Sequence, residues 1–203
     1  MKEFNLIVTG IGGQGSLTLA LIIAEAALSE GYEVKTSELH GLSQRGGVVP
    51  CHIRFGKRIY SSRVRVGKAD LVIALEPLEA LRACVYGSKE KTVFLVDSER
   101  IVPISSSLGD RYPSNQEIKK ILKGFSSKVF FVDASKTLKK EYGSETGTNV
   151  FMLGIASCSN LIPLKKESLF EGIRRIIPEK YFGMNKEIFD LGCKLKIKKE
   201  KKF

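Results

Sequence analysis

Two glycine-containing stretches of this 203-residue chain have residue types and spacing suited to binding an anion. In the first, glycines at positions 10, 12 and 15 match the G-x-G-x-x-G spacing between an apolar strand and a helix. Glycines there allow a sharp turn and leave backbone N–H groups at the helix N-terminus open to an anion. The candidate binding residues of this turn are Gly10, Gly12, Gly13, Gln14 and Gly15. A close strand–helix crossing that binds nothing is the alternative, and the motif alone supports it equally.

The second stretch, residues 43–47, has the sequence Ser-Gln-Arg-Gly-Gly. Arg45, beside Gly46, can present a planar guanidinium to a carboxylate or a phosphate. Ser43 and Gln44 add neutral hydrogen-bonding groups, so these four residues are further candidates for binding. Taken alone, the stretch favours a simpler alternative, in which Arg45 pairs with a nearby acid of the same chain.

The first turn can be compared with two kinds of nucleotide site. A P-loop requires Lys-Ser or Lys-Thr after its last glycine, and this chain has Ser16-Leu17 there, which argues against nucleotide hydrolysis. A nicotinamide or flavin site needs an acidic residue after the second strand, and Glu38 lies in that region. This second possibility stays open, although the polar segment after Glu38 interrupts the regular βαβ order.

The remaining polar residues do not assemble a catalytic site. His40 and His52 have no acidic or cysteine neighbours at metal-ligand spacing, and His40 is expected on the surface. Asp97 and Asp133 end two predicted strands, where they face a ligand crevice or, by the favoured interpretation, cap the following turn. There is no G-x-S-x-G motif. The pattern therefore favours a subunit or binding domain over a self-sufficient enzyme.

The four cysteines argue against a metal centre on this chain. They are Cys51, Cys84, Cys158 and Cys193, and no two form a C-x-x-C pair. Neither a zinc site nor an iron–sulfur run is therefore predicted, and any cluster must belong to another chain. With no secretory signal in the sequence, we expect all four to be buried, reduced thiols.

The elements that position these residues predict one α/β domain. Apolar runs typical of buried parallel strands alternate with helical segments. Strands are expected near residues 4–9, 32–37, 70–75, 92–96 and 128–132, and a β-hairpin is expected from 48–55 and 58–62 across Gly56-Lys57. Helices are expected at residues 16–30, 76–86, 114–124, 134–142, 148–161, 166–177 and 179–193. The predicted fold is a single Rossmann-like domain with a mostly parallel sheet, an inserted β-hairpin and a helical C-terminal third.

The composition is ordinary for a soluble globular protein: 43% of residues are hydrophobic and 27% charged. Because no signal peptide is recognisable, a cytoplasmic location is expected. No apolar run is long enough for a membrane helix. The formal net charge is +11, but residues 194–203 contain six lysines and one glutamate and so supply +5 of it. We expect this lysine-rich tail to be disordered and the domain to span residues 1–193. A nucleic-acid partner would rest on charge alone and is not predicted.

The two glycine stretches together are far more specific than either one. With the segment 37–47, Ser-Glu-Leu-His-Gly-Leu-Ser-Gln-Arg-Gly-Gly, the turn resembles the gamma-type subunits of the 2-oxoacid:ferredoxin oxidoreductases. The form of this segment is similar to the indolepyruvate branch of that family. Further matches are Asn149 with the Met-Leu-Gly at 152–154, and Asn185 with Phe189 and Gly192. The resemblance spans roughly residues 4–193.

The resemblance implies a role inside a larger enzyme. Such enzymes decarboxylate a 2-oxo acid oxidatively, here an aryl one, form an acyl-CoA with coenzyme A as co-substrate, and pass electrons to ferredoxin. It implies that thiamine diphosphate, Mg and the 4Fe-4S clusters belong to a large partner subunit and that this chain alone binds no cofactor. We expect this chain to cover the partner's active site, with the first turn and Arg45 binding an anion such as the phosphates of coenzyme A. Two alternatives remain: another 2-oxo acid (pyruvate, 2-oxoglutarate or 2-oxoisovalerate), or a free-standing NAD- or FAD-binding oxidoreductase.

Overall fold

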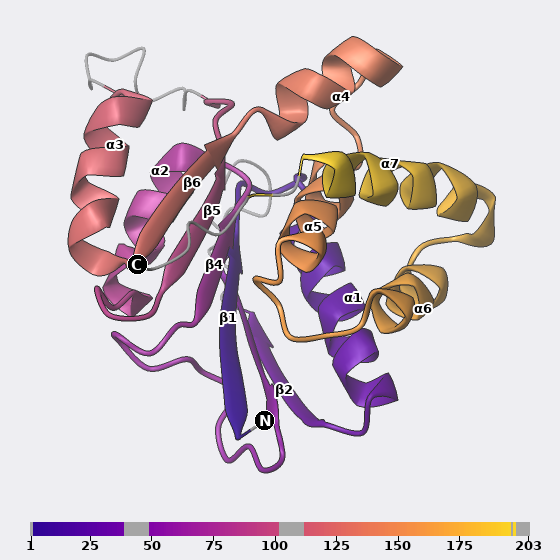
Figure 1. Cartoon of the computed structure of the whole chain (residues 1–203), viewed down its shortest axis with the longest axis horizontal. Coiled ribbons are helices and arrows are strands. Elements are labelled where there is room, and N and C mark those ends of the chain that lie inside the picture. The colour runs from indigo at the N-terminus through magenta and orange to yellow at the C-terminus, as the bar shows by residue number, and fades with distance from the viewer. Residues whose placement is uncertain (1, 39–48, 102–111, 196, 198–203) are drawn as a thin grey trace.

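The computed structural model describes residues 2–38, 49–101, 112–195 and 197. In this part of the chain a six-stranded sheet has the strand order β2-β3-β1-β4-β5-β6, with helices on both faces (Figure 1). The strands are β1 (Glu3–Thr9), β2 (Glu33–Glu38), β3 (Cys51–Gly56), β4 (Leu71–Ala74), β5 (Val93–Asp97) and β6 (Lys128–Val132). β1, β4, β5 and β6 pair in parallel, whereas β3 is antiparallel to both β1 and β2. The mostly parallel sheet is therefore confirmed.

The helices form one layer on each face of the sheet. They are α1 (Ser16–Ser29), α2 (Pro77–Arg82), α3 (Asn115–Leu122), α4 (Ala134–Tyr142), α5 (Thr148–Cys158), α6 (Lys166–Ile176) and α7 (Phe182–Lys194). In β1, Leu6 and Val8 pack with α1, α5, α6 and α7, while Ile7 faces the cluster under α2 and α3. Because both faces are covered, the parallel strands β4 and β5 are buried apolar runs, as the sequence predicted, whereas β2 at the sheet edge is polar. No helix among the described residues is long and apolar enough to cross a membrane.

The predicted hairpin across Gly56-Lys57 is wrong. Residues 57–62 form no strand, and β3 lies between β1 and β2 with both of its edges occupied. Since no free edge of β3 remains, the chain after Gly56 instead buries Ile59, whose backbone N–H donates to Glu33 Oε2 at 2.5 Å. The inserted antiparallel pair does exist, but it is β2 with β3, joined through residues 39–50.

The expectation of four reduced thiols is also wrong, because Cys158 and Cys193 form a disulfide with a Cα–Cα distance of 5.2 Å. Glycines let α5 and α7 cross closely: a Cβ on Gly154 would lie 2.2 Å from the carbonyl oxygen of Phe189. This crossing brings together two cysteines that are 35 residues apart in sequence. Cys51 and Cys84 are free, as expected, and burial raises the pKa of Cys51 to about 12.

The C-terminal end of the chain is described only in part. α7 ends at Lys194, and the backbone N–H of Ile197 donates to Ser159 Oγ at 2.8 Å. Residue 196 and residues 198–203 lie outside the described residues. The division into a domain ending at residue 193 and a disordered tail at 194–203 therefore stays a prediction.

Reduction of the Cys158–Cys193 disulfide is expected to lower the free energy of unfolding by roughly 3–4 kcal/mol, because a closed loop of this length restricts the unfolded chain. Urea unfolding with and without reductant measures the change. Cys193→Ser should lower the free energy of unfolding by the same amount, and reductant should not lower it further. In Cys84→Ser, which keeps the disulfide, reductant should still lower the free energy of unfolding. Four titratable thiols in the unreduced, denatured protein would contradict the assignment.

A buried acidic side chain on α2 carries an energetic cost. Glu79 is 1% exposed; its Oε1 pairs with Arg82, while its Oε2 has no partner among the described residues. Burial raises the pKa of Glu79 to about 7, although Arg82 opposes that shift. Its neighbour Glu76 is fully buried too, but it caps α2 by accepting from the N–H groups of Leu78 and Glu79. The unpaired oxygen of Glu79 therefore disfavours the ionised form.

Glu79→Gln is expected to stabilise the protein above neutral pH. In the unfolded chain the carboxyl ionises near its ordinary pKa of 4.5, whereas in the folded chain it does so near 7. Stability should therefore fall as the pH rises between these values, and the variant should remove this fall, gaining roughly 3 kcal/mol at pH 8 and little at pH 4. Urea unfolding across this range measures it, with exposed Glu187→Gln as the control. An equal gain at both pH values would contradict ionisation of the buried carboxyl as the cause.

Candidate functional site

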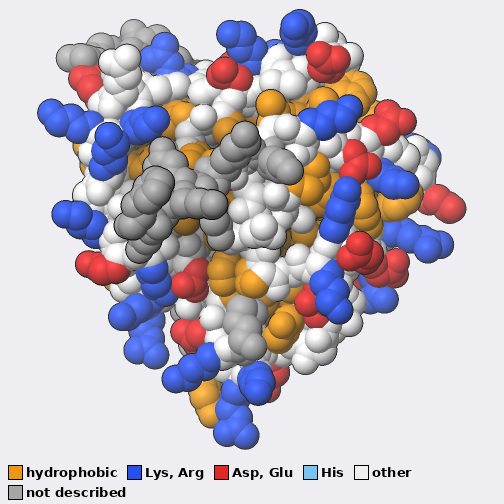
Figure 2. Space-filling view, in the orientation of Figure 1, with side chains coloured by type: hydrophobic (Ala, Val, Ile, Leu, Met, Phe, Trp, Pro, Cys, Tyr) orange, Lys and Arg blue, Asp and Glu red, His pale blue; other side chains and the backbone are white. Residues whose placement is uncertain are grey.

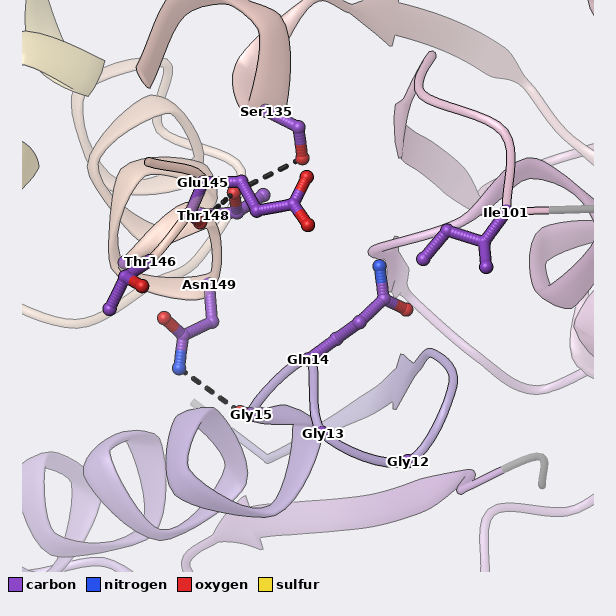
Figure 3. Close-up of a pocket in the computed structure, with 11 residues that line it drawn as sticks. Gly12, Gly13, Gln14, Gly15, Ile101, Ser135, Glu145, Thr146, Thr148 and Asn149 are labelled. Carbon is purple, nitrogen blue, oxygen red and sulfur yellow. Dashed lines mark hydrogen bonds between the residues drawn. The ribbon is translucent and has the colours of Figure 1, made fainter. Parts of the chain in front are cut away.

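A pocket of about 470 Å³ opens at the carboxyl edge of the parallel strands. Between β1 and β4 the order of the strands changes direction. Open α/β sheets bind ligands at the carboxyl edge beside such a switch point. Figure 3 shows the glycine turn after β1 on one side and the start of α5 on the other. The lining residues are Gly12, Gly13, Gln14, Gly15, Ile101, Ser135, Glu145, Thr146, Gly147, Thr148 and Asn149.

The N-terminus of α1 meets this pocket without a capping side chain. Gly15 is the N-cap residue, in a left-handed conformation with φ 80°, and no side chain accepts a hydrogen bond from the first turn. Among the described residues nothing accepts from the N–H groups of Ser16 and Leu17. The Oγ of Ser16 is buried and likewise has no partner there. This helix end therefore offers unused donors and the positive end of a helix dipole.

Gln14 holds the glycine turn against the sheet. Its Oε1 accepts from the Ile11 N–H at 2.7 Å, and its Nε2 donates to the Leu75 carbonyl at 2.8 Å. Gly10 lies beneath this side chain, because a Cβ there would be 2.9 Å from Gln14 Oε1 and 2.7 Å from Ser16 Oγ. The turn is thus fastened to the ends of both β1 and β4.

α5 begins in the same way as α1. Its N-cap residue is Gly147, also left-handed with φ 93°, and again no side chain caps it. Asn149, in the first turn, donates from Nδ2 to the carbonyl oxygen of Gly15 at 3.1 Å (Figure 3). A Cβ on Gly15 would lie only 2.5 Å from that Nδ2 atom. The Thr148 and Val150 N–H groups nevertheless have acceptors, in the Glu145 carbonyl and Asn149 Oδ1. The open N-terminus of α1 is therefore joined at the pocket to an α5 start that is largely satisfied.

Hydroxyl groups on the far wall are positioned by a buried acid. Asp97, at the end of β5, accepts from the N–H groups of Ala134 and Ser135 and from the Ser135 hydroxyl. It therefore caps α4, a helix that begins 37 residues later and not the turn that was favoured from the sequence, and its burial raises its pKa. The Oγ of Ser135 lies 3.1 Å from Oγ1 of Thr148 (Figure 3). Both hydroxyls border the pocket.

The charge of the described lining is not by itself enough for a strongly anionic ligand. The lining contains no lysine or arginine among the residues that the structure describes. Its one carboxylate, Glu145, is turned toward the space between Ser135 and Gln14 (Figure 3) and pairs with Lys139 Nζ at 3.0 Å. The pocket thus supplies neutral donors, and a cation for a phosphate must come from outside this set.

The residues predicted from the first turn are brought together here. Gly12, Gly13, Gln14 and Gly15 line the pocket, and Gly10 lies beneath it. That any of them binds a cofactor or substrate stays a prediction.

The predicted Ser43, Gln44, Arg45 and Gly46 lie outside the described residues, as does His40. The chain on either side of them is nevertheless anchored close to the turn: Glu38 pairs with Cys51, and the Val49 N–H donates to the Gly10 carbonyl at 3.0 Å. Glu38 and Val49, the nearest described residues on either side, thus both lie at this edge of the sheet.

Sequence reasoning misses half of the pocket. Ser135, Thr148 and Asn149 are not predicted as lining residues, because nothing in the sequence shows that α4 and α5 begin beside α1. A usable signal is present in Gly147-Thr148, where a glycine directly before a predicted helix allows an uncapped, left-handed start.

The described residues do not fit a metal or cluster site. No group of three or more His, Cys, Asp or Glu side chains among them is placed to hold an ion. Two of the cysteines are bonded to each other, and Cys51 and Cys84 lie apart on β3 and after α2. His52 is fully buried, and desolvation lowers its pKa to about 4.

Comparison with known proteins decides the family. The model of the pyruvate ferredoxin/flavodoxin oxidoreductase family matches residues 5–195. The chain belongs to this family.

Members of this family and solved structures resemble the chain over most of its length. The indolepyruvate oxidoreductase subunit IorB of Thermococcus kodakarensis is 42% identical, covering 96% of both chains. The pyruvate/ketoisovalerate oxidoreductases common subunit gamma of Pyrococcus furiosus is 30% identical over 81% of this chain and 82% of its own. The fold matches the 2-oxoglutarate:ferredoxin oxidoreductase of Magnetococcus marinus with a TM-score of 0.72 and 23% identity, covering 99% of this chain and 32% of that one.

Gly15→Ala is expected to destabilise the protein more than Gly13→Ala does. Both glycines have positive φ, so each alanine costs about 1 kcal/mol in backbone strain, but only Gly15 also faces Asn149. Around Gly13 a Cβ meets nothing within 4 Å. Chemical unfolding measures both, and adding Asn149→Ala should recover part of the Gly15→Ala loss. Equal losses at the two glycines would contradict the contact.

Proposed function

We propose that this chain is the small subunit of an indolepyruvate-type 2-oxoacid:ferredoxin oxidoreductase. It is a subunit of an oxidoreductase that forms an acyl-CoA from an aryl 2-oxo acid and passes the electrons to ferredoxin. Its similarity to the IorB subunit over nearly the whole of both chains supports the indolepyruvate type. Similarity to the pyruvate/ketoisovalerate gamma subunit keeps another 2-oxo acid as the second candidate.

The chain completes an active site that a large partner subunit carries. Thiamine diphosphate with Mg, held by that partner, supplies the decarboxylation chemistry, and 4Fe-4S clusters there take the electrons. The separation of Cys51 and Cys84 and the Cys158–Cys193 bond support placing the clusters on the partner. No described residue of this chain is in a position to act as an acid–base pair or nucleophile in the pocket, so its contribution is binding.

The single observation that carries this role is the open N-terminus of α1, which the bond from Asn149 to Gly15 holds against the start of α5. Amide donors at the start of α1 bind an oxyanion without any charged side chain. The hydroxyls of Ser135 and Thr148 only border this space, because they already donate to Asp97 and to the Glu145 carbonyl. Coenzyme A presents phosphates of this kind, and a related solved enzyme of the same fold is titled with coenzyme A bound. Arg45 supplies the missing cation, which the bond from Val49, four residues later in the chain, to the Gly10 carbonyl supports.

Asn149→Ala in the reconstituted two-subunit enzyme is expected to raise the KM for coenzyme A about tenfold, because the two helix ends lose the bond that aligns them. The KM for the 2-oxo acid should change little. Asn185→Ala is the matched control, since this buried asparagine also donates to a backbone carbonyl, that of Tyr181, but on α7. Initial-rate kinetics at varied coenzyme A measure both variants.

Arg45→Ala should weaken coenzyme A dependence or subunit docking in the same assay. An unchanged KM for coenzyme A in both Asn149→Ala and Arg45→Ala, with normal assembly, would sink the proposed role of the pocket. Failure of the wild-type chain to form a complex with a thiamine- and iron-containing subunit would sink the proposed function itself.

A further inference from the structure

The segment after β3, residues 57–68, is the most strongly basic stretch of the described chain outside its helices, and we call it the basic loop. Its charged residues are Lys57, Arg58, Arg63, Arg65 and Lys68, and it contains no acid. All five are exposed, and none takes part in an ion pair within the described part of the chain. No described acid therefore neutralises the charge of this loop by direct pairing.

Two exposed apolar side chains lie among these charges. Tyr60 is 81% exposed and Val66 is 71% exposed, the two largest values among the described large hydrophobic side chains. Tyrosine and arginine are enriched among the residues that contribute most of the binding energy at protein interfaces. A nucleic acid would satisfy the charges, but it would leave Val66 without an apolar partner. The mixture therefore favours a protein surface.

The basic loop is held in place before any partner binds. Ile59 and Val64 point inward and are 3% exposed. The Val64 N–H donates to Nδ1 of the buried His52 at 3.2 Å, and Arg54 donates from its guanidinium to the Ser61 carbonyl at 2.7 Å. A loop ordered in this way loses little conformational entropy on binding, which is the property of a pre-organised interface.

The basic loop lies at the opposite end of the sheet from the pocket. Gly56, which precedes it, pairs with Glu3 at the start of β1, whereas the glycine turn follows the end of β1. In Figure 2, Lys and Arg side chains gather at this lower end of the molecule, near the N-terminus marked in Figure 1. The two sites are therefore separate surfaces of one domain.

We propose that the basic loop is a docking surface for an acidic face of the large partner subunit, a second contact that is distinct from the shared pocket. This inference rests on the proposed function. Charge complementarity between the unpaired basic residues and an acidic face supplies steering, and Tyr60 and Val66 supply the apolar contact.

The test is the dissociation constant between the chain and the large subunit, measured by titration at several salt concentrations. Arg63→Glu with Arg65→Glu is expected to raise the constant about tenfold and to flatten its salt dependence. Lys119→Glu with Lys120→Glu on α3 makes the same change in net charge at another exposed surface. This pair should leave the dissociation constant and its salt dependence unchanged. Tyr60→Ser, at a side chain with almost no internal packing, should raise the constant on its own.

An unchanged constant in both the arginine and the Tyr60 variants, while the wild-type chain assembles, would overturn the inference and leave the proposed function intact. Wild-type binding to duplex DNA or anionic vesicles that the arginine variant loses, with assembly unchanged, would assign the loop to another occupant and also overturn it. If the wild-type chain does not assemble at all, both the inference and the proposed function fail.

Discussion

The contact between Asn149 and Gly15 is the constraint on which the site depends. Because the Asn149 amide occupies the space where a Cβ would stand, position 15 must be glycine, and its left-handed backbone starts α1 without a side-chain cap. The same hydrogen bond draws the N-terminus of α5 against that of α1. One small contact thus holds two helix starts together, and the first turn of α1 keeps unused donors beside it.

The result is a pocket of a specific and incomplete kind. Three helices, α1, α4 and α5, start at its walls, but Asp97 already satisfies α4, so only the other two face the pocket uncapped. The described lining has hydroxyl and amide groups, and its one carboxylate is paired with Lys139. Donors without a lysine or arginine among the described lining residues agree with the binding role that we propose for this chain.

Much of the fold could be predicted from the sequence because local patterns determine it. The strand ending in Asp97 and the helix capped by Ser114 with Glu117 are readable from apolar runs and a capping box, and the structure has both. Strand pairing was less accessible. Residues 58–62 are rich in β-forming types, but they could pair with β3 only at a free edge of that strand. Both edges of β3 are occupied, by β1 and by β2.

The site was half predictable for the same reason. The glycine turn is a contiguous motif, whereas Ser135 and Thr148 reach the pocket from segments more than one hundred residues later in the chain. The Cys158–Cys193 bond was missed because it depends on how closely α5 and α7 cross, which glycines on both helices allow. Motifs made of neighbouring residues can be recognised in the sequence, whereas contacts between distant segments depend on how the helices and strands pack.

Amide hydrogen exchange in the assembled two-subunit enzyme tests most directly whether the pocket at the starts of α1 and α5 binds an anion. We predict that coenzyme A slows exchange in peptides covering the starts of α1 and α5, residues 15–18 and 147–150. The start of α3, which Ser114 already caps, serves as the internal reference and should not change. Coenzyme A that binds the complex and protects other segments, with both helix starts exchanging as before, would contradict the central claim.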